Sequence, residues 1–512
     1  MSSTTKSREA VQGKTTSPQT YNNYIGGHWV KAENGETFPS LNPANVKEII
    51  GHFAASTPTD VKKAVDAAAA AFPKWKRTPA PHRAEIILKA AYLLEQRKEE
   101  MATTMVREMG KVIKEARGDV QEAIDMAKYM AGEGRRLAGQ TVPSELKDKF
   151  AMSVRAPIGV VGLITPWNFP VAIPSWKIFP ALVAGNTVVF KPATDTPLCA
   201  LMLVEVLIEA GVPPGVLNFI TGAGSKVGMA IVEDPRVRAI SITGSTDVGK
   251  KVAGRCGELM KRISCELGGK NAICVMEDAD LELAVDGALW GAFGTAGQRC
   301  TAASRIIVHK DRYDEYVEAL VKRAKTLKLG NGLDPSVHVG PVINKSQLAS
   351  INNYVAIGQK EGAKLLFGGK IVTDGELADG CFHEPTIFGD VKQDMRIAQE
   401  EIFGPVTAVI KVNDFEEAIK VANGTDYGLS LSMYTKDVNR AFRAMEELES
   451  GIVYINAPTI GAEIQLPFGG VKQTGNGHRE AGLTAIDQFT EWKTIFVDYS
   501  GRLQKAQIDS YE

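Results

Sequence analysis

The first third of the chain carries its apolar residues at helical spacing. Apolar side chains recur on one helical face around residues 86–94 and again over 120–131, which predicts two amphipathic helices. Both stripes consist of apolar residues and contain no reactive group. We therefore expect these helices to contribute to a core and not to chemistry.

In the middle of the chain, short apolar runs alternate with a helical segment. Ile158–Ile164 and Thr187–Phe190 are continuous apolar runs, as in strands that are covered on both faces. A helix is predicted over Leu198–Ala210, because a glycine and a Val-Pro-Pro-Gly turn follow it. Leu217–Ile220 and Ala239–Thr243 indicate two further strands. This alternation predicts an α/β fold with a parallel, doubly wound sheet.

A second stretch of alternating strands and helices runs from about residue 271 to 468. Its helices are predicted near 279–292, 311–327 and 437–449. Because such a stretch can bury a sheet of its own between helices, we expect a separate α/β domain here.

Two apolar strands stand apart from both stretches. Phe150, Met152 and Val154 alternate with smaller residues, which is typical of a half-exposed strand. Thr494–Val497 is an apolar run near the C-terminus with little chain left to cover it. Exposed strands of this kind need a partner. They pair either with each other or with another subunit, and the pattern leaves both possibilities open.

The overall composition is that of an ordinary globular protein. Its 512 residues suggest about three domains, and 44% are hydrophobic and 23% charged. The chain has 59 basic and 60 acidic residues, which argues against a nucleic acid as the main partner, since nucleic-acid binders carry a basic excess. No segment approaches the ~20 apolar residues of a membrane-spanning helix, so we expect no membrane contact.

Six scattered cysteines bear on the compartment. They form no Cys-x-x-Cys pair and have no nearby His. We therefore expect neither a disulfide framework nor a metal site, but reduced thiols in a cytoplasmic protein. Residues 1–20 contain no apolar core, which argues against a secretory signal. We interpret them as a disordered tail, with a transit peptide as the alternative because they are rich in Ser and Thr.

Two segments are candidates for binding a nucleotide. Gly244, Ser245 and Gly249 follow a predicted strand and open a predicted helix, where backbone N–H groups and the helix dipole attract phosphate and Ser245 could cap the helix. The spacing is not that of the Gly-x-Gly-x-x-Gly fingerprint, so an ordinary tight turn is the alternative. Lys191 follows the strand Thr187–Phe190 at the edge where ligands bind in open α/β sheets, unless it is a solvated lysine.

Cys300 and Glu266 are the candidates for covalent chemistry. Cys300 lies in a turn rich in small residues, and Arg299 beside it is expected to favour the reactive thiolate. The other five cysteines have apolar or helical surroundings and are expected in the core. Glu266 ends an apolar strand before a Gly-Gly turn, where a partly desolvated carboxylate could act as a general base. A surface acid or a helix cap is the alternative for Glu266.

Seven short motifs follow one another along nearly the whole chain. They are Pro166–Pro170, Phe190–Pro192, Thr243–Ser245, Glu266–Gly269, Gly297–Cys300, Glu400–Pro405 and Pro467–Gly470. A single motif of this kind is weak evidence, because short motifs occur by chance, whereas seven in this order are specific. The ordered set resembles the set of motifs in the aldehyde dehydrogenase superfamily. The resemblance implies an NAD(P)-dependent enzyme that oxidises an aldehyde to a carboxylic acid.

The resemblance implies a role for each of three residues in the reaction. Cys300 would attack the aldehyde to give a thiohemiacetal, and the Asn168 amide and the Cys300 N–H would form the oxyanion hole. Hydride transfer to the nicotinamide would leave a thioester, and Glu266 would activate the water that hydrolyses it. CoA-acylating relatives commonly lack this base, so Glu266 disfavours an acylating enzyme. The three residues together also argue against a non-catalytic structural protein that keeps only the fold.

The same resemblance implies a dinucleotide site. Glu401 and Phe403 match residues that hold the nicotinamide ribose and ring, Lys191 an adenine-ribose contact, and the segment 244–249 the pyrophosphate helix. NAD-preferring members often carry Glu where this chain has Thr194, and its absence removes repulsion against a 2′-phosphate. We therefore expect NADP to be used well, with NAD also accepted. The residues expected to contact the cofactor are Ile164, Thr165, Pro166, Trp167, Lys191, Thr194, Gly224, Gly244, Ser245, Val248, Leu267, Glu401 and Phe403.

The resemblance also bears on the substrate. Ile455–Gly461 and Thr474–Glu480 look like segments of enzymes that oxidise 2-ketoglutarate semialdehyde (2,5-dioxopentanoate). Arg299 would suit that aldehyde by binding its remote carboxylate. Alternatively Arg299 turns away and supports its loop, beside an apolar funnel for varied aliphatic or aromatic aldehydes. Glu480 has no expected role, because the stretch before it is one residue longer than in many members. The residues expected to face the substrate are Phe169, Trp176, Arg299, Thr301 and Phe468.

The resemblance further implies the domain organisation. Residues 21–142 and 158–267 would form a Rossmann-like cofactor domain, and residues 268–483 an α/β catalytic domain. Residues 143–157 and 484–500 would form a small β element used in oligomerisation. Members of the superfamily form dimers, often paired into tetramers, so a homodimer or homotetramer is expected.

Overall fold

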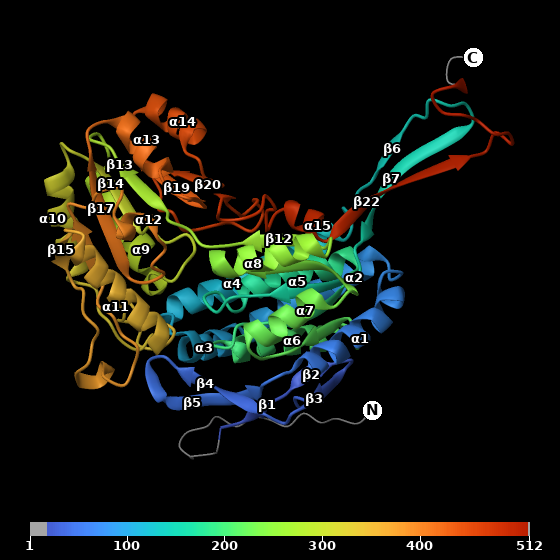
Figure 1. Ribbon diagram of the computed structural model, residues 1–512, viewed down its shortest axis with the longest axis horizontal. Helices are drawn as coiled ribbons and strands as arrows, with labels where there is room; N and C mark the ends of the chain where they lie inside the picture. Colours follow the sequence, from blue (N-terminus) through green and yellow to red (C-terminus); the bar gives the residue numbers. More distant parts are fainter. Residues whose placement is uncertain (1–17, 510–512) are drawn as a thin grey trace.

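Two seven-stranded sheets organise residues 18–509, the part of the chain that the computed structural model describes (Figure 1). One sheet uses strands between residues 23 and 266, and the other uses strands between 272 and 455. Most of the predicted tail lies outside the described residues. Its last residue, Thr20, already pairs with His52 in a small sheet of β1 (Thr20–Tyr21), β5 (Asn45–Ala54) and β4 (Thr37–Asn42).

The first sheet reverses its strand order in the middle. Its strands are β2 (Asn23–Ile25), β3 (His28–Val30), β8 (Val160–Ile164), β9 (Thr187–Lys191), β10 (Leu217–Phe219), β11 (Val237–Thr243) and β12 (Arg262–Glu266). From β8 the chain adds β9 and β10 on one side and then β11 and β12 on the other, so the order is β12-β11-β8-β9-β10-β2-β3. The strands β12 to β10 run parallel. In such sheets, ligands bind at the carboxyl ends of the strands where the order reverses.

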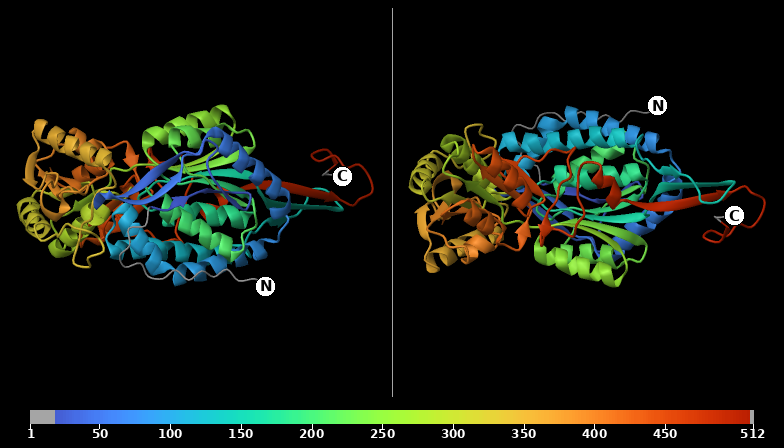
Figure 2. Two further views of the ribbon diagram at one scale, coloured as in Figure 1. Left: turned by 90° about the horizontal axis from the view of Figure 1, so that it is seen from below. Right: turned by 90° about the horizontal axis from the view of Figure 1, so that it is seen from above.

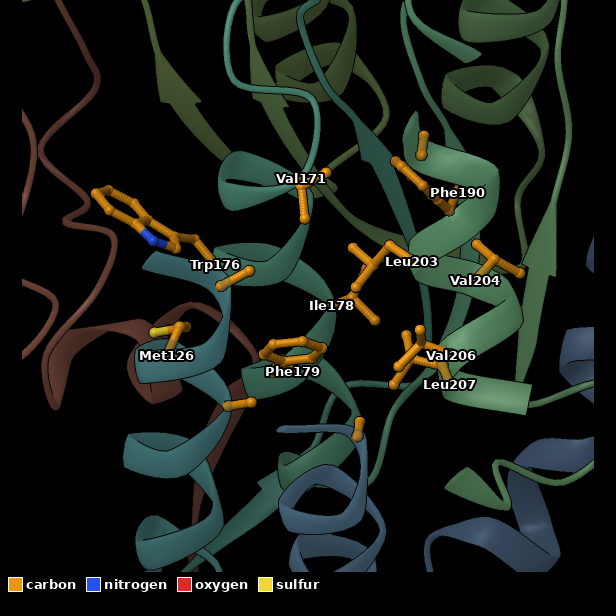
Figure 3. Close-up of a cluster of buried hydrophobic side chains, with 14 of the residues drawn as sticks. Met126, Val171, Trp176, Ile178, Phe179, Phe190, Leu203, Val204, Val206 and Leu207 are labelled. Atoms are coloured by element: carbon orange, nitrogen blue, oxygen red, sulfur yellow. The ribbon is translucent and has the colours of Figure 1, made fainter. Parts of the chain in front are cut away.

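Helices cover the first sheet on both faces. They are α1 (Pro58–Trp75), α2 (Ala80–Gln96), α3 (Lys98–Met109), α4 (Ile113–Glu133), α5 (Ala172–Ala184), α6 (Pro197–Ala210), α7 (Met229–Glu233) and α8 (Thr246–Glu258). Neighbouring residues of β9 point to opposite faces, so Val188 belongs to the core under α2 to α6 and Val189 to the core under α1, α7 and α8. Figure 3 shows part of the larger core, with Phe179 of α5 between Met126 of α4 and Leu207 of α6.

The second sheet has its own core and helices. Its strands are β13 (Ala272–Val275), β14 (Arg305–His309), β15 (Lys364–Phe367), β16 (Thr386–Gly389), β17 (Val406–Val412), β19 (Ser430–Tyr434) and β20 (Ile452–Ile455). They lie in the order β15-β16-β17-β14-β13-β19-β20, and only the edge strand β15 runs antiparallel to its neighbour in this sheet. The helices around them include α9 (Leu281–Phe293), α10 (Tyr313–Ala324), α11 (Lys345–Lys360), α13 (Phe415–Asn423) and α14 (Val438–Glu447).

The predicted α/β fold with parallel strands is confirmed. The two apolar stripes of the first region fall on α2 and α4, and the predicted strands of the middle region fall on β8 to β11. The helix predicted before the Val-Pro-Pro-Gly turn is α6, and the three later ones are α9, α10 and α14. No helix in residues 18–509 is long and apolar enough to cross a membrane.

The two outlying strands pair with each other. β7 (Lys149–Pro157) runs antiparallel to β22 (Thr490–Asp498) over its whole length, and β6 (Gln140–Val142) lies on the other side of β7. The predicted half-exposed strand is confirmed: Ala151 is buried, whereas Phe150 is 41% exposed. Phe150 is exposed because the three strands form an arm that projects from the body of the molecule (Figures 1 and 2).

Candidate active site

A cavity of about 540 Å³ lies at the carboxyl ends of β8 and β11, where the strand order of the first sheet reverses. Every residue that the sequence assigned to the cofactor lines this cavity, together with Asn168 and Cys300. A larger and more open cavity, of about 1050 Å³, lies between α1 and α7, and none of the candidate catalytic residues lines it. The sequence motifs therefore converge on one place, although they are spread over 240 residues, from Ile164 to Phe403.

Cys300 is held by a side chain that the sequence did not single out. The Asn271 amide donates hydrogen bonds to the carbonyl oxygens of Cys300 at 2.7 Å and Ala302 at 3.0 Å. The Asn271 side-chain oxygen accepts from the Ser430 N–H at 3.0 Å. A Cβ at Gly269 would lie 2.5 Å from the Cys300 carbonyl oxygen, so this approach requires glycine. The sequence signal for Asn271 was weak, because it only follows another polar residue, Lys270, before an apolar strand.

The surroundings of Cys300 disfavour its thiolate. Burial raises the pKa of Cys300 well above its usual range, and the negative charges of Glu401 and Glu266 raise it further. The expectation that Arg299 favours the thiolate is not met, because the Arg299 guanidinium forms an ion pair with Glu115 at 3.1 Å. The other five cysteines are buried, as expected.

Asn168 reaches the loop that carries Cys300. It follows β8 in the first sheet, is buried, and donates from its side-chain amide to the Gln298 carbonyl oxygen at 3.1 Å. The Gln298 side chain in turn binds the Thr295 carbonyl at 3.1 Å and the Ile343 N–H at 2.9 Å. The amide of Asn168 is therefore fixed next to the nucleophile loop by backbone groups of the second half of the chain.

Glu266 ends β12 and turns away from the cavity. A Cβ at Gly469 would lie 2.5 Å from its carboxylate, so Glu266 lies against the Gly469–Gly470 turn. Burial, and after it the negative charge of Glu480, hold the pKa of Glu266 well above its usual range. Glu480 itself forms a buried ion pair with Lys177 of α5.

Lys177 and Glu480 were both missed as neighbours of the candidate base. Lys177 also donates to the Ser241 hydroxyl at 3.0 Å, which ties α5 to β11. The available signal for Lys177 was a charged residue in the otherwise apolar helix Ala172–Ala184. Glu480 had no comparable signal, because its partner lies 303 residues away in the sequence.

The loop between α12 (Arg396–Gln399) and β17 presents Glu401 and Phe403 to the cavity. Glu401 accepts from the Gly269 N–H at 3.0 Å, and burial raises its pKa to about 7. The Phe403 ring packs edge-on against Trp167 with centroids 5.3 Å apart. The Gln347 amide donates to the Phe403 carbonyl at 2.9 Å. These contacts join the motifs around residues 167, 269 and 403 into one wall.

Lys191 and Thr194 also line the cavity. Lys191 is buried and donates to the Pro192 carbonyl at 2.8 Å, and burial lowers its pKa to about 8. It is therefore not a solvated strand-end lysine. Ser245 occupies the N-cap position of α8, but its side chain makes no capping hydrogen bond within the described part of the chain. The suggestion that Ser245 caps this helix is therefore wrong.

The residues expected to face the substrate do not line the cofactor cavity. The Trp176 and Phe468 rings pack edge-on at 5.0 Å, and Trp176 belongs to the same buried core as Phe179, with its ring turned away from the Phe179 ring (Figure 3). The Phe169 ring lies between two cations, 3.4 Å from the Lys111 ammonium and 5.3 Å from the Arg299 guanidinium. Thr301 is buried on the other side of Cys300, and its carbonyl accepts from Thr459 at 2.7 Å.

A half-buried cysteine beside a cavity at the switch point of a doubly wound sheet fits an oxidoreductase that binds a nicotinamide dinucleotide. The model of the aldehyde dehydrogenase family matches residues 29–495. The chain belongs to the aldehyde dehydrogenase family, and it is an NAD(P)-dependent aldehyde oxidoreductase.

Relatives and solved structures agree with this assignment. An alpha-ketoglutaric semialdehyde dehydrogenase of Bacillus subtilis (strain 168) is 44% identical over 94% of this chain and 99% of its own length. A 2,5-dioxopentanoate dehydrogenase of Saccharolobus solfataricus is 42% identical over 92% of this chain and 98% of its own. The structure of a betaine aldehyde dehydrogenase from Staphylococcus aureus, in complex with NAD+, is similar at a TM-score of 0.92 and 37% identity. That similarity covers 94% of this chain and 95% of that one.

We expect the reactivity of Cys300 to depend on the acids around it. Its rate of alkylation by iodoacetamide should keep rising with pH to beyond about pH 9, since the pKa lies above the ordinary thiol value. Glu401→Gln removes a negative charge, lowers the pKa and raises the rate at pH 8. Glu400→Gln is the matched control, because that carboxylate is paired with Arg396. A plateau near pH 7 in the wild type would contradict the burial argument.

Proposed function

We propose that this aldehyde dehydrogenase oxidises 2-ketoglutarate semialdehyde through a covalent intermediate on Cys300. The Cys300 thiol gives its proton to water, and the sulfur then attacks the carbonyl carbon to give a thiohemiacetal. The Asn168 amide and the Cys300 N–H donate hydrogen bonds to the oxyanion. A nicotinamide dinucleotide held by the cavity residues, among them Glu401 and Phe403, would supply the hydride acceptor, and loss of hydride from the thiohemiacetal would leave a thioester on Cys300. Glu266 takes a proton from water, the water oxygen attacks the thioester carbon, and the acid leaves as the C–S bond breaks.

The observation that carries this mechanism is the shared cavity. Cys300 and Asn168 line the same cavity as all the residues assigned to the dinucleotide, including Glu401 and Phe403. A hydride acceptor and a nucleophile must be adjacent for hydride to leave the thiohemiacetal. Glu266 acts from outside this lining, and reaches the water after its side chain rotates away from the Gly469–Gly470 turn.

Two observations support the substrate. The relatives that are 44% and 42% identical to this chain carry names for the same aldehyde, whose second end is a carboxylate. The Lys111 and Arg299 cations flank Phe169 next to the nucleophile loop, and a carboxylate is favoured near such charges. Glu115 and Asp119 neutralise much of this positive charge, so the relatives carry more of the argument than Arg299 does.

For the cofactor we propose that NADP is used well and NAD is also accepted. Thr194 lines the cavity beside Lys191. The absence of a carboxylate at position 194 removes one source of repulsion against a 2′-phosphate, and the Lys191 ammonium attracts it. The Asp195 carboxylate also lines the cavity and offsets part of this attraction.

We further propose that the domain bounds follow the resemblance and that the arm joins subunits into a homodimer or homotetramer. The arm displays Trp492 and Phe496, which are 55% and 61% exposed. Its strand β22 forms one edge of the arm sheet, and β20 forms an edge of the second sheet. Edges and exposed aromatic side chains of this kind favour pairing with another chain.

A panel of aldehydes tests the proposed reaction. With NADP and without CoA, 2-ketoglutarate semialdehyde should give the highest kcat/KM when compared with succinic semialdehyde, benzaldehyde and hexanal, and the acid should form. Cys300→Ala should abolish the oxidation but retain NADP binding. Equal kcat/KM for hexanal would favour a broad-specificity enzyme, and a requirement for CoA an acylating one. If no aldehyde reduces NADP, the protein is not catalytic.

Replacing the proposed base should separate the two half-reactions. In Glu266→Gln the hydride step should proceed and deacylation should slow, because the variant cannot accept the proton of water. A stopped-flow trace would then show a burst of about one NADPH per active site followed by slow turnover. Glu416→Gln, an exposed acid paired with Arg443, is the control. Normal steady-state oxidation by Glu266→Gln would show that another group is the base.

The cofactor proposal is tested at position 194. Thr194→Glu should move the ratio of kcat/KM values towards NAD by about tenfold or more, since like charges at contact repel. Thr194→Gln has the same length without the charge, and should move the ratio much less. The proposal fails if the wild type prefers NAD over NADP by more than about 100-fold, which corresponds to roughly 2.7 kcal/mol.

A further inference from the structure

The turn before Cys300 has an unfavourable backbone conformation. Thr295 and Ala296 adopt left-handed φ angles of 54° and 52°, and Gly297 follows with 68°. Glycine accepts this conformation freely, whereas each residue with a Cβ loses about 1–2 kcal/mol in it. Two such residues in succession persist only where other contacts hold them.

Glu115 supplies those contacts. Both of its carboxylate oxygens lie 3.0 Å from the Thr295 N–H, and one accepts from the Thr295 hydroxyl at 3.2 Å. Arg299 completes a closed set of hydrogen bonds among the three side chains, because its guanidinium donates to the Thr295 hydroxyl at 2.9 Å and to Glu115 at 3.1 Å. One carboxylate thus binds both ends of the segment that immediately precedes Cys300.

These contacts are shielded from water. The Glu115 and Arg299 side chains are each 12% exposed, and Thr295 is buried. In such surroundings hydrogen bonds to charged groups are stronger than at a surface, and removal of one partner leaves the other without compensation. The hydrogen bonds among Glu115, Thr295 and Arg299 therefore form a stable attachment of the loop to α4, unlike an exposed ion pair.

The attachment joins two separate parts of the molecule. Glu115 lies in the first turn of α4, which packs on α2, α3 and α5 over the first sheet. Thr295 and Arg299 belong to the loop after α9, in the second half of the chain. The start of α4 is also fixed to the second half, since the Ile113 N–H donates to the Gly332 carbonyl at 2.9 Å.

We propose that Glu115 is a positioning residue for the nucleophile, which it places by clamping Thr295 and Arg299 in the left-handed turn. This inference rests on the proposed role of Cys300. The Gln298 carbonyl that receives the Asn168 amide lies within the clamped segment, so the clamp sets the Cys300 N–H and the Asn168 amide relative to each other. It also explains why Arg299 points to α4: the guanidinium completes the clamp.

The test compares Glu115→Ala, which removes the clamp, with Glu115→Gln, which keeps an acceptor for the Thr295 N–H but loses the charge. We expect kcat to fall by about tenfold or more in Glu115→Ala and by less in Glu115→Gln, because small displacements of a reacting group are costly. The dissociation constant for NADP should change less than about twofold. Glu99→Gln, an exposed acid paired with Arg117, is the control and should behave like the wild type.

A rescue experiment separates positioning from general destabilisation. Glycine at position 296 adopts the left-handed turn without strain, so Glu115→Ala/Ala296→Gly should recover part of the kcat that Glu115→Ala loses. Thermal unfolding of each variant is measured alongside. Wild-type kcat in Glu115→Ala would overturn the proposal. The proposal would also be overturned if Glu115→Ala lost kcat and NADP affinity in parallel and Ala296→Gly did not restore kcat. If Cys300→Ala still oxidises aldehydes, the proposed mechanism itself fails, whatever the Glu115 variants show.

Discussion

The short link between the two sheets is the constraint on which the site depends. Only a few residues separate Glu266, at the end of β12, from Asn271, which precedes β13 and holds the carbonyl of Cys300. The link lies very close to its neighbours. A Cβ at Gly268 would lie 2.2 Å from the Glu401 carboxylate, and a Cβ at Gly269 would lie 2.5 Å from the Cys300 carbonyl oxygen. The link therefore sets the proposed base, the nucleophile and the cofactor wall at fixed distances.

The packing of the two halves of the chain on either side of this link also brings the acidic groups of the site close to Cys300. Glu266 is buried and Glu401 half-buried near Cys300, and loss of contact with water raises the pKa of each of the three groups. Each negative charge makes the next ionisation harder, since few water molecules screen them. Lys177 offsets part of this charge near Glu266. These effects disfavour the Cys300 thiolate, which is the form that reacts with oxidants and alkylating reagents.

Much of the site followed from the sequence, because its motifs are local. The segments around Asn168 and Lys191 each follow a strand that the apolar pattern predicts, and the carboxyl ends of such strands gather at one edge of a parallel sheet. Cys300 and Phe403 were found through their motifs. Asn271, Lys177, Glu480 and Glu115 were missed for the opposite reason. Each acts through a partner 29 to 303 residues away, and no local spacing encodes such a partner.

The sequence by itself determined the kinds of element, the two alternating α/β stretches and the family to which the chain belongs. Side-chain periodicity and short motifs express forces that act within a few residues. Tertiary structure alone decided that Arg299 pairs with Glu115 and not with solvent, that burial raises the pKa of Cys300, and that Phe150 lies exposed on an arm. Charge pairing, desolvation and the covered side of a strand depend on which distant segments pack together, and only the folded chain brings those segments into contact.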